Sequence, residues 1–320
     1  MTIHTIRDVL TPEALGLIDA IHRTGSMAAA ARELGVVPST LTYRVRQLED
    51  ALDVLLFDRS SRQARLTAAG KELLREGNRL LLELDAIANR VKRVATGWEP
   101  QLTLSVDSII SRATVMELCE AFFALEPPTR LRIREESLSG TLQALTSGQA
   151  DLAIGVAMDV ASGAGIEPSS NSALQSKILG SINFVYAVAP HHPLAQAIEP
   201  ITDDMMLQHR AVAVADSVQR GGGMTVGLLG GQDVFTVPGM MSKLDAQSRG
   251  LGAGFLPEYL ARPYIDTGRL VEKVVAQPPR VVRVSYAWLN SAGLKPGRAL
   301  QWWLNQLDKT ATQKALLERR

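Results

Sequence analysis

The chain is poor in cysteine, in net charge and in long hydrophobic runs. Its single cysteine, Cys119, excludes an intramolecular disulfide framework and favours a reducing compartment. The formal net charge of +1 does not indicate nucleic acid as a partner, so any basic surface must be local. No apolar run reaches the roughly 18 residues of a membrane-spanning helix, and the opening MTIHTIRDVLTPEAL lacks the features of an export signal. We therefore expect a cytoplasmic protein.

The length of 320 residues is enough for two or three domains. Apolar residues make up 46% of the chain and charged residues 21%, which is typical of a soluble globular protein. The pattern of elements predicts a mostly helical domain over residues 8–67, one long helix over 68–96 and an α/β domain over 101–308. We expect the last residues, 309–320, to form a frayed helical tail.

Three helices are predicted in the N-terminal domain. The stretch Thr11-Pro12-Glu13 is a strong helix start, because it combines an N-capping hydroxyl, a proline at the first helical position and an acid in the first turn. The next two helices cover residues 27–34 and 38–52, with Gly35 between them. Residues 55–67 then predict two short strands around a polar tip.

Small residues surround the corner between the second and third helices. In GSMAAAARELGVVPSTLTYRVRQLE, the alanines at 28–31 let two helices cross closely, and Gly35 supplies a left-handed turn. The third helix has an apolar stripe and an opposite polar face, which is made of Ser39, Thr42, Tyr43 and Arg46. This pattern is typical of a helix-turn-helix, whose second helix enters the DNA major groove. The alternative is a plain αα-hairpin.

Three arginines accompany the short strands, at positions 59, 62 and 65. A hairpin wing with these side chains can reach the backbone phosphates beside the groove. Taken alone, the same arginines would also suit a solvated hairpin.

Residues 67–95 predict a single helix roughly 40 Å long. Its apolar residues follow alternating steps of three and four, with Gly77 as the one gap, and they form the a/d seam Leu73, Leu80, Leu84, Ile87, Val91 and Val94. Such a seam predicts pairing with another helix, and a homodimer would supply the symmetry that an operator with two half-sites requires. The alternative is a long helix packed on its own domain.

Strand and helix patterns alternate beyond Pro100, which predicts an α/β fold with a largely parallel sheet. The expected strands lie within residues 101–110, 131–138, 151–158, 182–190, 210–217, 233–239, 252–257 and 281–289. The expected helices cover 112–125, 141–147, 240–249, 258–266 and 298–307.

The sequence resembles the LysR-type transcriptional regulators. The specific part of the resemblance is TGSMAAAARELGVVPSTLTYRVRQLEDAL followed by LLFDRSSRQARLTAAG, while GQADLAIG, FVYAVAPHHPLA and GLGAGFLP resemble looser landmarks of the family's effector domain. The family's contact glutamine falls on Pro38 and its arginine on Tyr43, so base preference does not carry over there. Thr42 keeps a hydroxyl, and Arg59 stands at the wing arginine. The predicted DNA-binding set is Ser26, Pro38, Ser39, Thr42, Tyr43, Arg46, Arg59, Arg62 and Arg65.

The resemblance implies a winged helix-turn-helix, a linker helix and a two-lobed effector domain of periplasmic-binding-protein type. One lobe would hold residues 101–160 and 277–308 and the other 170–275, with two crossover strands as the hinge and a small effector between the lobes. The implied protein is a transcriptional regulator that binds a double-stranded dyad operator as a homodimer through the linker helix. A homotetramer and RNA polymerase as a partner also follow from the resemblance.

Ligands of open α/β sheets bind beyond the carboxyl ends of the strands, where loops and helix starts offer donors. The residues at such places are the predicted effector-binding set: Asp107, Ser108, Ser137, Ser139, Ser217 and Phe255. Hydroxyls and helix-start amides suit a small anion or a hydroxylated ring, whereas an inward Asp107 counts against a strongly anionic effector. The charge of the effector stays open, and the alternative role of each serine is helix capping.

Two other classes of function stay open from the sequence: a small-molecule-binding protein whose N-terminal helices serve assembly only, and an α/β enzyme. No nucleophile, metal or phosphate motif is recognisable. The glycines of GLGAG lack the position and spacing of a dinucleotide loop, and His191-His192 has no partner spaced to complete a metal site. We expect no catalytic residue, no metal and no cofactor beyond a small effector.

Overall fold

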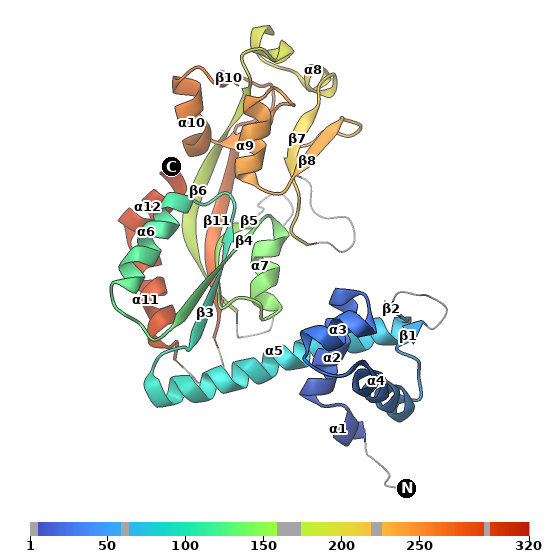
Figure 1. Cartoon of the computed structure of the whole chain (residues 1–320). Coiled ribbons are helices and arrows are strands. Elements are labelled where there is room, and N and C mark those ends of the chain that lie inside the picture. The colour runs from blue at the N-terminus through green and yellow to red at the C-terminus, as the bar shows by residue number, and fades with distance from the viewer. Residues whose placement is uncertain (1–5, 59–63, 159–173, 219–225, 291–294, 320) are drawn as a thin grey trace. The chain divides into compact units, whose positions relative to one another are not determined.

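The chain divides into two units, residues 1–90 and 91–320, and the division falls within one long helix. The computed structural model describes residues 6–58, 64–158, 174–218, 226–290 and 295–319 (Figure 1).

The N-terminal unit is mostly helical, and a short antiparallel hairpin follows its first four helices (Figure 1). Thr11 caps the second helix by accepting a hydrogen bond from the Ala14 backbone N–H at 3.3 Å, so the predicted helix start is confirmed. The third predicted helix also has the expected bounds. The elements are α1 (Ile6–Val9), α2 (Pro12–Thr24), α3 (Met27–Glu33), α4 (Pro38–Leu52), β1 (Phe57–Asp58), β2 (Arg65–Leu66) and α5 (Ala68–Thr96).

Two alanines set the close packing of α2, α3 and α4. Ala30 and Ala31 are completely buried in the core of this unit, whereas Ala28 is exposed. Gly35 has φ +65°, so the left-handed turn expected after α3 is present. The buried face of α4 consists of Leu41, Val45 and Leu48, as its apolar stripe predicts.

A buried carboxylate ties the hairpin to α4. Glu49 Oε1 accepts hydrogen bonds from the backbone N–H groups of Leu56 at 2.8 Å and Phe57 at 3.4 Å. Gly70 of α5 packs so close to the same segment that a Cβ there would lie 2.1 Å from the Leu56 carbonyl oxygen. The geometry of the hairpin therefore depends on α4 and on the first turn of α5.

The long helix α5 has two different roles along its length. At its start, Leu73 and Leu74 pack on the core of the N-terminal unit, and a Cβ at Gly77 would lie 2.9 Å from Leu15 Cδ2 of α2. The gap in the heptad seam therefore accommodates α2. The other seam residues are 39–71% exposed: Leu80, Leu84, Ile87, Val91 and Val94.

The C-terminal unit is built on a seven-stranded mixed sheet in the order β10-β6-β11-β5-β3-β4, with β9 also paired to β6. A separate parallel pair is formed by β7 and β8. The strands are β3 (Gln101–Asp107), β4 (Arg130–Glu136), β5 (Leu152–Met158), β6 (Leu174–Val188), β7 (Ala211–Val214), β8 (Val234–Val237), β9 (Gly254–Pro257), β10 (Val271–Lys273) and β11 (Arg280–Leu289). The helices are α6 (Arg112–Phe123), α7 (Ser139–Thr146), η1 (Pro193–Gln196), α8 (Asp203–Leu207), α9 (Met240–Ser248), α10 (Glu258–Asp266), α11 (Arg298–Leu307) and α12 (Thr310–Glu318).

Two long strands run through both lobes of this unit. β6 and β11 pair from Leu174 with Leu289 to Phe184 with Arg280. β11 also pairs with β5 in the first lobe, while the later half of β6 pairs with β9 and β10 in the second lobe (Figure 1). This ladder is the covalent and hydrogen-bonded connection between the lobes.

Two expectations about this unit were wrong. The large sheet is not largely parallel: β3 is parallel to β4 and β5, but β6 pairs antiparallel with β9, β10 and β11. The expected frayed tail is instead the helix α12, whose Leu316 and Leu317 are buried, and the Leu316 carbonyl accepts a hydrogen bond from the Ser111 N–H at 2.9 Å. In both cases the deciding contacts join residues far apart in the sequence.

We expect Ala30→Leu to lower the free energy of unfolding of the N-terminal unit by about 1–3 kcal/mol, because added methyl groups have no space at a completely buried position. Scanning calorimetry of the full chain measures this change. Ala28→Leu is the matched control, since Ala28 is exposed on the same helix and its substitution should change the stability little. Equal effects of the two substitutions would contradict the packing argument.

Candidate functional site

The exposed face of α4 carries the residues predicted to contact DNA. Ser39, Tyr43 and Arg46 are exposed and Thr42 is partly exposed, on the side opposite the buried leucines. Tyr43 is 62% exposed, which is unusual for a large aromatic side chain without a partner surface. Pro38, at the first position of α4, is exposed beside them.

Local hydrogen bonds order part of this face. The Thr42 hydroxyl donates to the Pro38 carbonyl oxygen at 3.0 Å, and Gln47 Nε2 donates to the Tyr43 hydroxyl at 3.1 Å. Gln47 was missed by the sequence reasoning, although its spacing of four from Tyr43 places it on the same side of the helix. Both bonds are between exposed or half-exposed groups, so they can be exchanged for contacts to a ligand.

The remaining residues of the predicted DNA-binding set have different positions. Ser26 is the N-cap of α3, and its Oγ accepts a hydrogen bond from the Ala29 N–H at 3.1 Å. Its hydroxyl therefore has a structural role at the corner. Arg65 is exposed on β2, in register with Asp58 of β1. Arg59 and Arg62 lie outside the described residues.

Four serines of the predicted effector-binding set lie together in the C-terminal unit. The hydroxyl oxygens of Ser108 and Ser137 are 2.9 Å apart, and Ser217 Oγ accepts a hydrogen bond from the Ser137 N–H at 2.8 Å. Ser139 Oγ donates to Asp216 Oδ2 at 2.6 Å. The ends of β3 and β4 in the first lobe thus meet the segment after β7 in the second lobe. We call Ser108, Ser137, Ser139 and Ser217 the serine cluster.

Gly140 allows this close approach of the two lobes. A Cβ at Gly140 would lie 2.5 Å from Ser217 Cβ, closer than side chains pack. At position 140, any larger residue would separate the start of α7 from Ser217. The serine cluster therefore depends on the absence of a side chain at Gly140 as well as on the serine hydroxyls.

Asp107 has a structural position beneath the serine cluster. It is 3% exposed, and its carboxylate accepts hydrogen bonds from the Ile109 N–H at 3.0 Å and the Thr141 hydroxyl at 2.9 Å. The backbone of Leu138 also donates to it, and Leu138 has a strained φ of +57°. Burial raises the pKa of Asp107 to about 7, and the nearby charge of Asp216 adds to this effect. The carboxylate thus positions the start of α7.

Phe255 is separate from this arrangement. It lies within β9 rather than at its end, is 7% exposed, and packs edge-on against Tyr186 with ring centroids 5.2 Å apart. These neighbours belong to the core of the second lobe. Because Phe255 is buried in this core, its position does not support the interpretation that it forms the wall of an open effector site.

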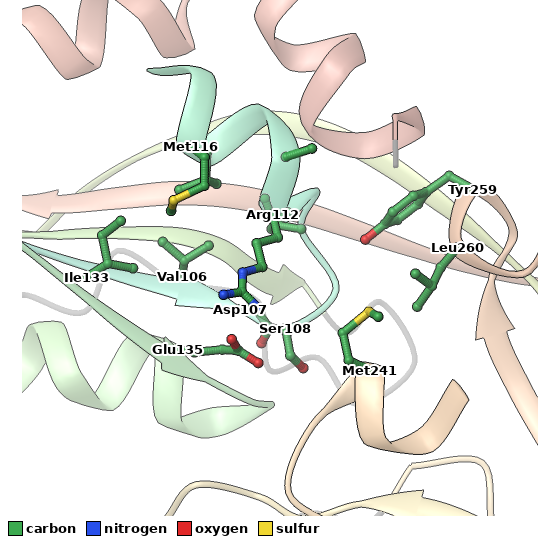
Figure 2. A pocket seen from close by; sticks show the side chains of 13 residues that line it. Val106, Asp107, Ser108, Arg112, Met116, Ile133, Glu135, Met241, Tyr259 and Leu260 are labelled. Carbon is green, nitrogen blue, oxygen red and sulfur yellow. The ribbon is translucent and has the colours of Figure 1, made fainter. Parts of the chain in front are cut away.

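A cavity of about 610 Å³ lies beside the cluster, between α6 and the strands β3 and β4 on one side and α9 and α10 on the other. Figure 2 shows the Arg112 side chain within it, near Val106 and Glu135, with Tyr259 and Met241 across from it. Asp107 and Ser108 contribute to its lining. The other lining residues were not predicted, because apolar helix positions such as Val115 have the same pattern whether they line a cavity or a core.

Two family comparisons cover nearly the whole chain. Residues 12–71 match the "Bacterial regulatory helix-turn-helix protein, lysR family", and residues 95–312 match the "LysR substrate binding domain". The chain belongs to the LysR family. This LysR-type protein is a DNA-binding transcriptional regulator with an effector-binding domain.

Relatives and solved structures agree with this membership. The LysR-type chain is 36% identical over 296 residues to the "Uncharacterized HTH-type transcriptional regulator YeeY" of Escherichia coli strain K12, covering 92% of each chain. It is 30% identical over 299 residues to the HTH-type transcriptional regulator PunR of the same strain, covering 93% of each. The LysR-family regulator CbnR has a TM-score of 0.59 at 16% identity, covering 93% of this chain and 98% of CbnR. The Vibrio cholerae virulence activator AphB has a TM-score of 0.54 at 18% identity, covering 93% and 98%. At these identities, the structures show the fold alone.

In the described part of the chain, no helix combines the length and apolar character needed to cross a membrane. Within the same ranges, no group of His, Cys, Asp and Glu is arranged to hold a metal ion.

We expect the stability of the C-terminal unit to depend on the ionisation of Asp107. Because its pKa is higher in the folded than in the unfolded chain, its contribution to stability is present below about pH 4 and is lost as the pH rises to about 7. The difference in unfolding free energy between Asp107→Asn and wild type should therefore shift in favour of the variant between pH 5 and pH 8. Urea denaturation at each pH measures it. Asp266→Asn, an exposed control, should show no such trend.

Proposed function

We propose that the protein binds a dyad operator as a homodimer, with α4 of each copy in the major groove and the β1–β2 hairpin beside it. The observation that carries this proposal is the exposed hydrogen-bonding face of α4, which the unit does not use for its own packing. Major-groove recognition requires such a face at the start of the second helix of a helix-turn-helix.

The residues of this face have distinct roles in the proposal. Ser39, Thr42 and Tyr43 contact base edges, and Arg46 contacts a phosphate or a base. Arg59, Arg62 and Arg65 contact backbone phosphates. Ser26 acts by fixing the start of α3, because its hydroxyl is used as the cap of that helix.

The effector binds in this proposal at the serine cluster, where the two lobes meet. The hydroxyls there are bonded to each other and to Asp216, so a ligand that enters must exchange these contacts for its own. Such an exchange alters the contact between the lobes. The effector then binds one arrangement of the two lobes more tightly than another, and so shifts the balance between them. The effector is a small molecule, and the protein acts as a regulator rather than an enzyme.

The proposal also includes an oligomeric state, a protein partner and a cellular location. The exposed seam of α5 supports a homodimer, and a homotetramer would arise by pairing two dimers. Contact with RNA polymerase and a cytoplasmic location complete the proposed role.

We expect Thr42→Ala to weaken operator binding by roughly 5- to 150-fold, the equivalent of losing one base contact worth about 1–3 kcal/mol. Gel shifts on the DNA upstream of the protein's own gene, at several salt concentrations, measure the affinity. Thr40→Ala is the matched control, because Thr40 is exposed on α4 roughly 100° around the helix from its neighbour Ser39. Unchanged specific affinity in Thr42→Ala, or an equal loss in Thr40→Ala, would count against the assignment.

We expect Leu80→Lys or Ile87→Lys to dissociate the dimer, because each places a charge in the apolar seam of α5. Sedimentation velocity should show a monomer, and the high-affinity gel shift should disappear with it. Leu82→Lys introduces the same charge at an exposed position off the seam and should leave the dimer intact. A wild-type chain that is monomeric at micromolar concentration would show that the seam has been misread.

A further inference from the structure

Helix α9 carries two polar side chains on its buried face. Lys243 is 8% exposed and Gln247 is completely buried, and their spacing of four residues places them on the same side of the helix. This side packs toward the strands of the second lobe. Apolar residues are usual at such positions, so these two side chains need a physical explanation.

Neither side chain has the partners that burial requires. Both the Nε2 and the Oε1 atoms of Gln247 are buried without a hydrogen-bond partner. Among the described residues, no carboxylate forms an ion pair with Lys243, although arginines at the surface form such pairs with aspartates. Burial and the charge of Arg280 lower the pKa of Lys243 to about 7. An unpaired buried polar group is costly to stability, so these two side chains call for a partner of opposite character.

A glycine lets both groups lie close to the backbone of β9. A Cβ at Gly254 would lie 3.0 Å from Gln247 Nε2 and 3.4 Å from Lys243 Nζ. The amide and the ammonium therefore lie over the same backbone position of β9. A side chain at position 254 would displace the two groups from this place.

A second cationic group faces the same region. The Arg280 guanidinium lies over the rings of Phe184 and Phe255, 5.5 and 5.3 Å from their centroids. Within the described ranges it forms no ion pair with a carboxylate, and its burial lowers its pKa. Two uncompensated positive charges in a low-dielectric interior attract an anion strongly.

The start of α9 connects this region to the serine cluster. A Cβ at Gly239, the N-cap of α9, would lie 3.3 Å from Glu135 Oε1 and 3.8 Å from Ser108 Cβ in the first lobe. The Lys243 N–H donates to the Gly239 carbonyl at 3.0 Å, so Lys243 is one turn further along the helix. The backbone of Lys243 is therefore one helical turn from the residue of α9 that approaches Ser108.

We infer that Lys243, Gln247 and Arg280 form a subsite for the carboxylate group of the effector. The two cations supply the charge, and the Gln247 amide donates the additional hydrogen bond. This inference rests on the proposed function in one respect, that the C-terminal unit binds a small effector. It also gives an answer to the open question of charge, because Lys243 and Arg280 favour an anionic effector.

Stability without ligand provides the first test. We expect Lys243→Met and Gln247→Leu each to raise the Tm of the full chain by roughly 2–4 °C, because apolar side chains of similar size remove unpaired buried groups. Lys314→Met, at an exposed lysine, is the matched control and should leave the Tm unchanged. A fall in Tm in both buried variants would show that the two groups are paired within the protein, and it would overturn the inference.

Ligand-dependent stability provides the second test. Acetate and benzoate, added at constant ionic strength against sodium chloride, should raise the Tm of the wild type and of Lys314→Met but not of Lys243→Met. Benzamide, the neutral counterpart of benzoate, should have no effect on any of them. Equal responses of the wild type and Lys243→Met would overturn the carboxylate subsite. A gel shift without any carboxylate tests operator binding separately. Failure of the carboxylate subsite can therefore be distinguished from failure of the proposed DNA binding.

Discussion

The pairing of β6 with β11 is the interaction on which the C-terminal unit depends. Each lobe adds its own strands to this ladder, so neither lobe has a complete sheet without it. The register shifts between Val284 and Ser285, next to Gly180 of β6, where a Cβ would lie 2.4 Å from Leu317 of α12. The irregularity and the glycine let α12 cover the middle of the ladder. The connection between the lobes is therefore braced by the last helix of the chain.

Local signals predicted the N-terminal unit well, because its elements are bounded by residues that act on their own neighbours. Pro12, Gly35 and Pro38 fix where helices begin or end through the backbone conformations they favour. The sheet was predicted less well, since the antiparallel direction of β6 depends on pairing with β11 about a hundred residues later. The packing of α12 depends on α6, about two hundred residues earlier, and its own sequence does not show this contact.

The candidate sites also differ in how far the sequence predicts them. Serines after strands could be predicted to gather at one edge, because strand ends and helix starts are visible in the sequence. Lys243 and Gln247 could not, since polar residues four apart on a short helix are equally typical of a solvated face. Asp107 shows the contrast: its buried carboxylate accepts hydrogen bonds from three donors, whereas the side-chain amide of Gln247 has no hydrogen-bond partner. Burial and pairing become visible only in three dimensions.

The docking of α5 on α2 through Gly77 fixes the direction of the apolar seam relative to α4. One residue inserted between Gly77 and Leu80 would rotate the exposed apolar stripe by roughly 100° around the helix axis. Pairing of two copies through that stripe would then turn each α4 to a different angle. In the proposed dimer, the spacing and orientation of the two half-sites would therefore depend on the length of this short helical stretch. Changes in length should be rare there and better tolerated in loops away from α5.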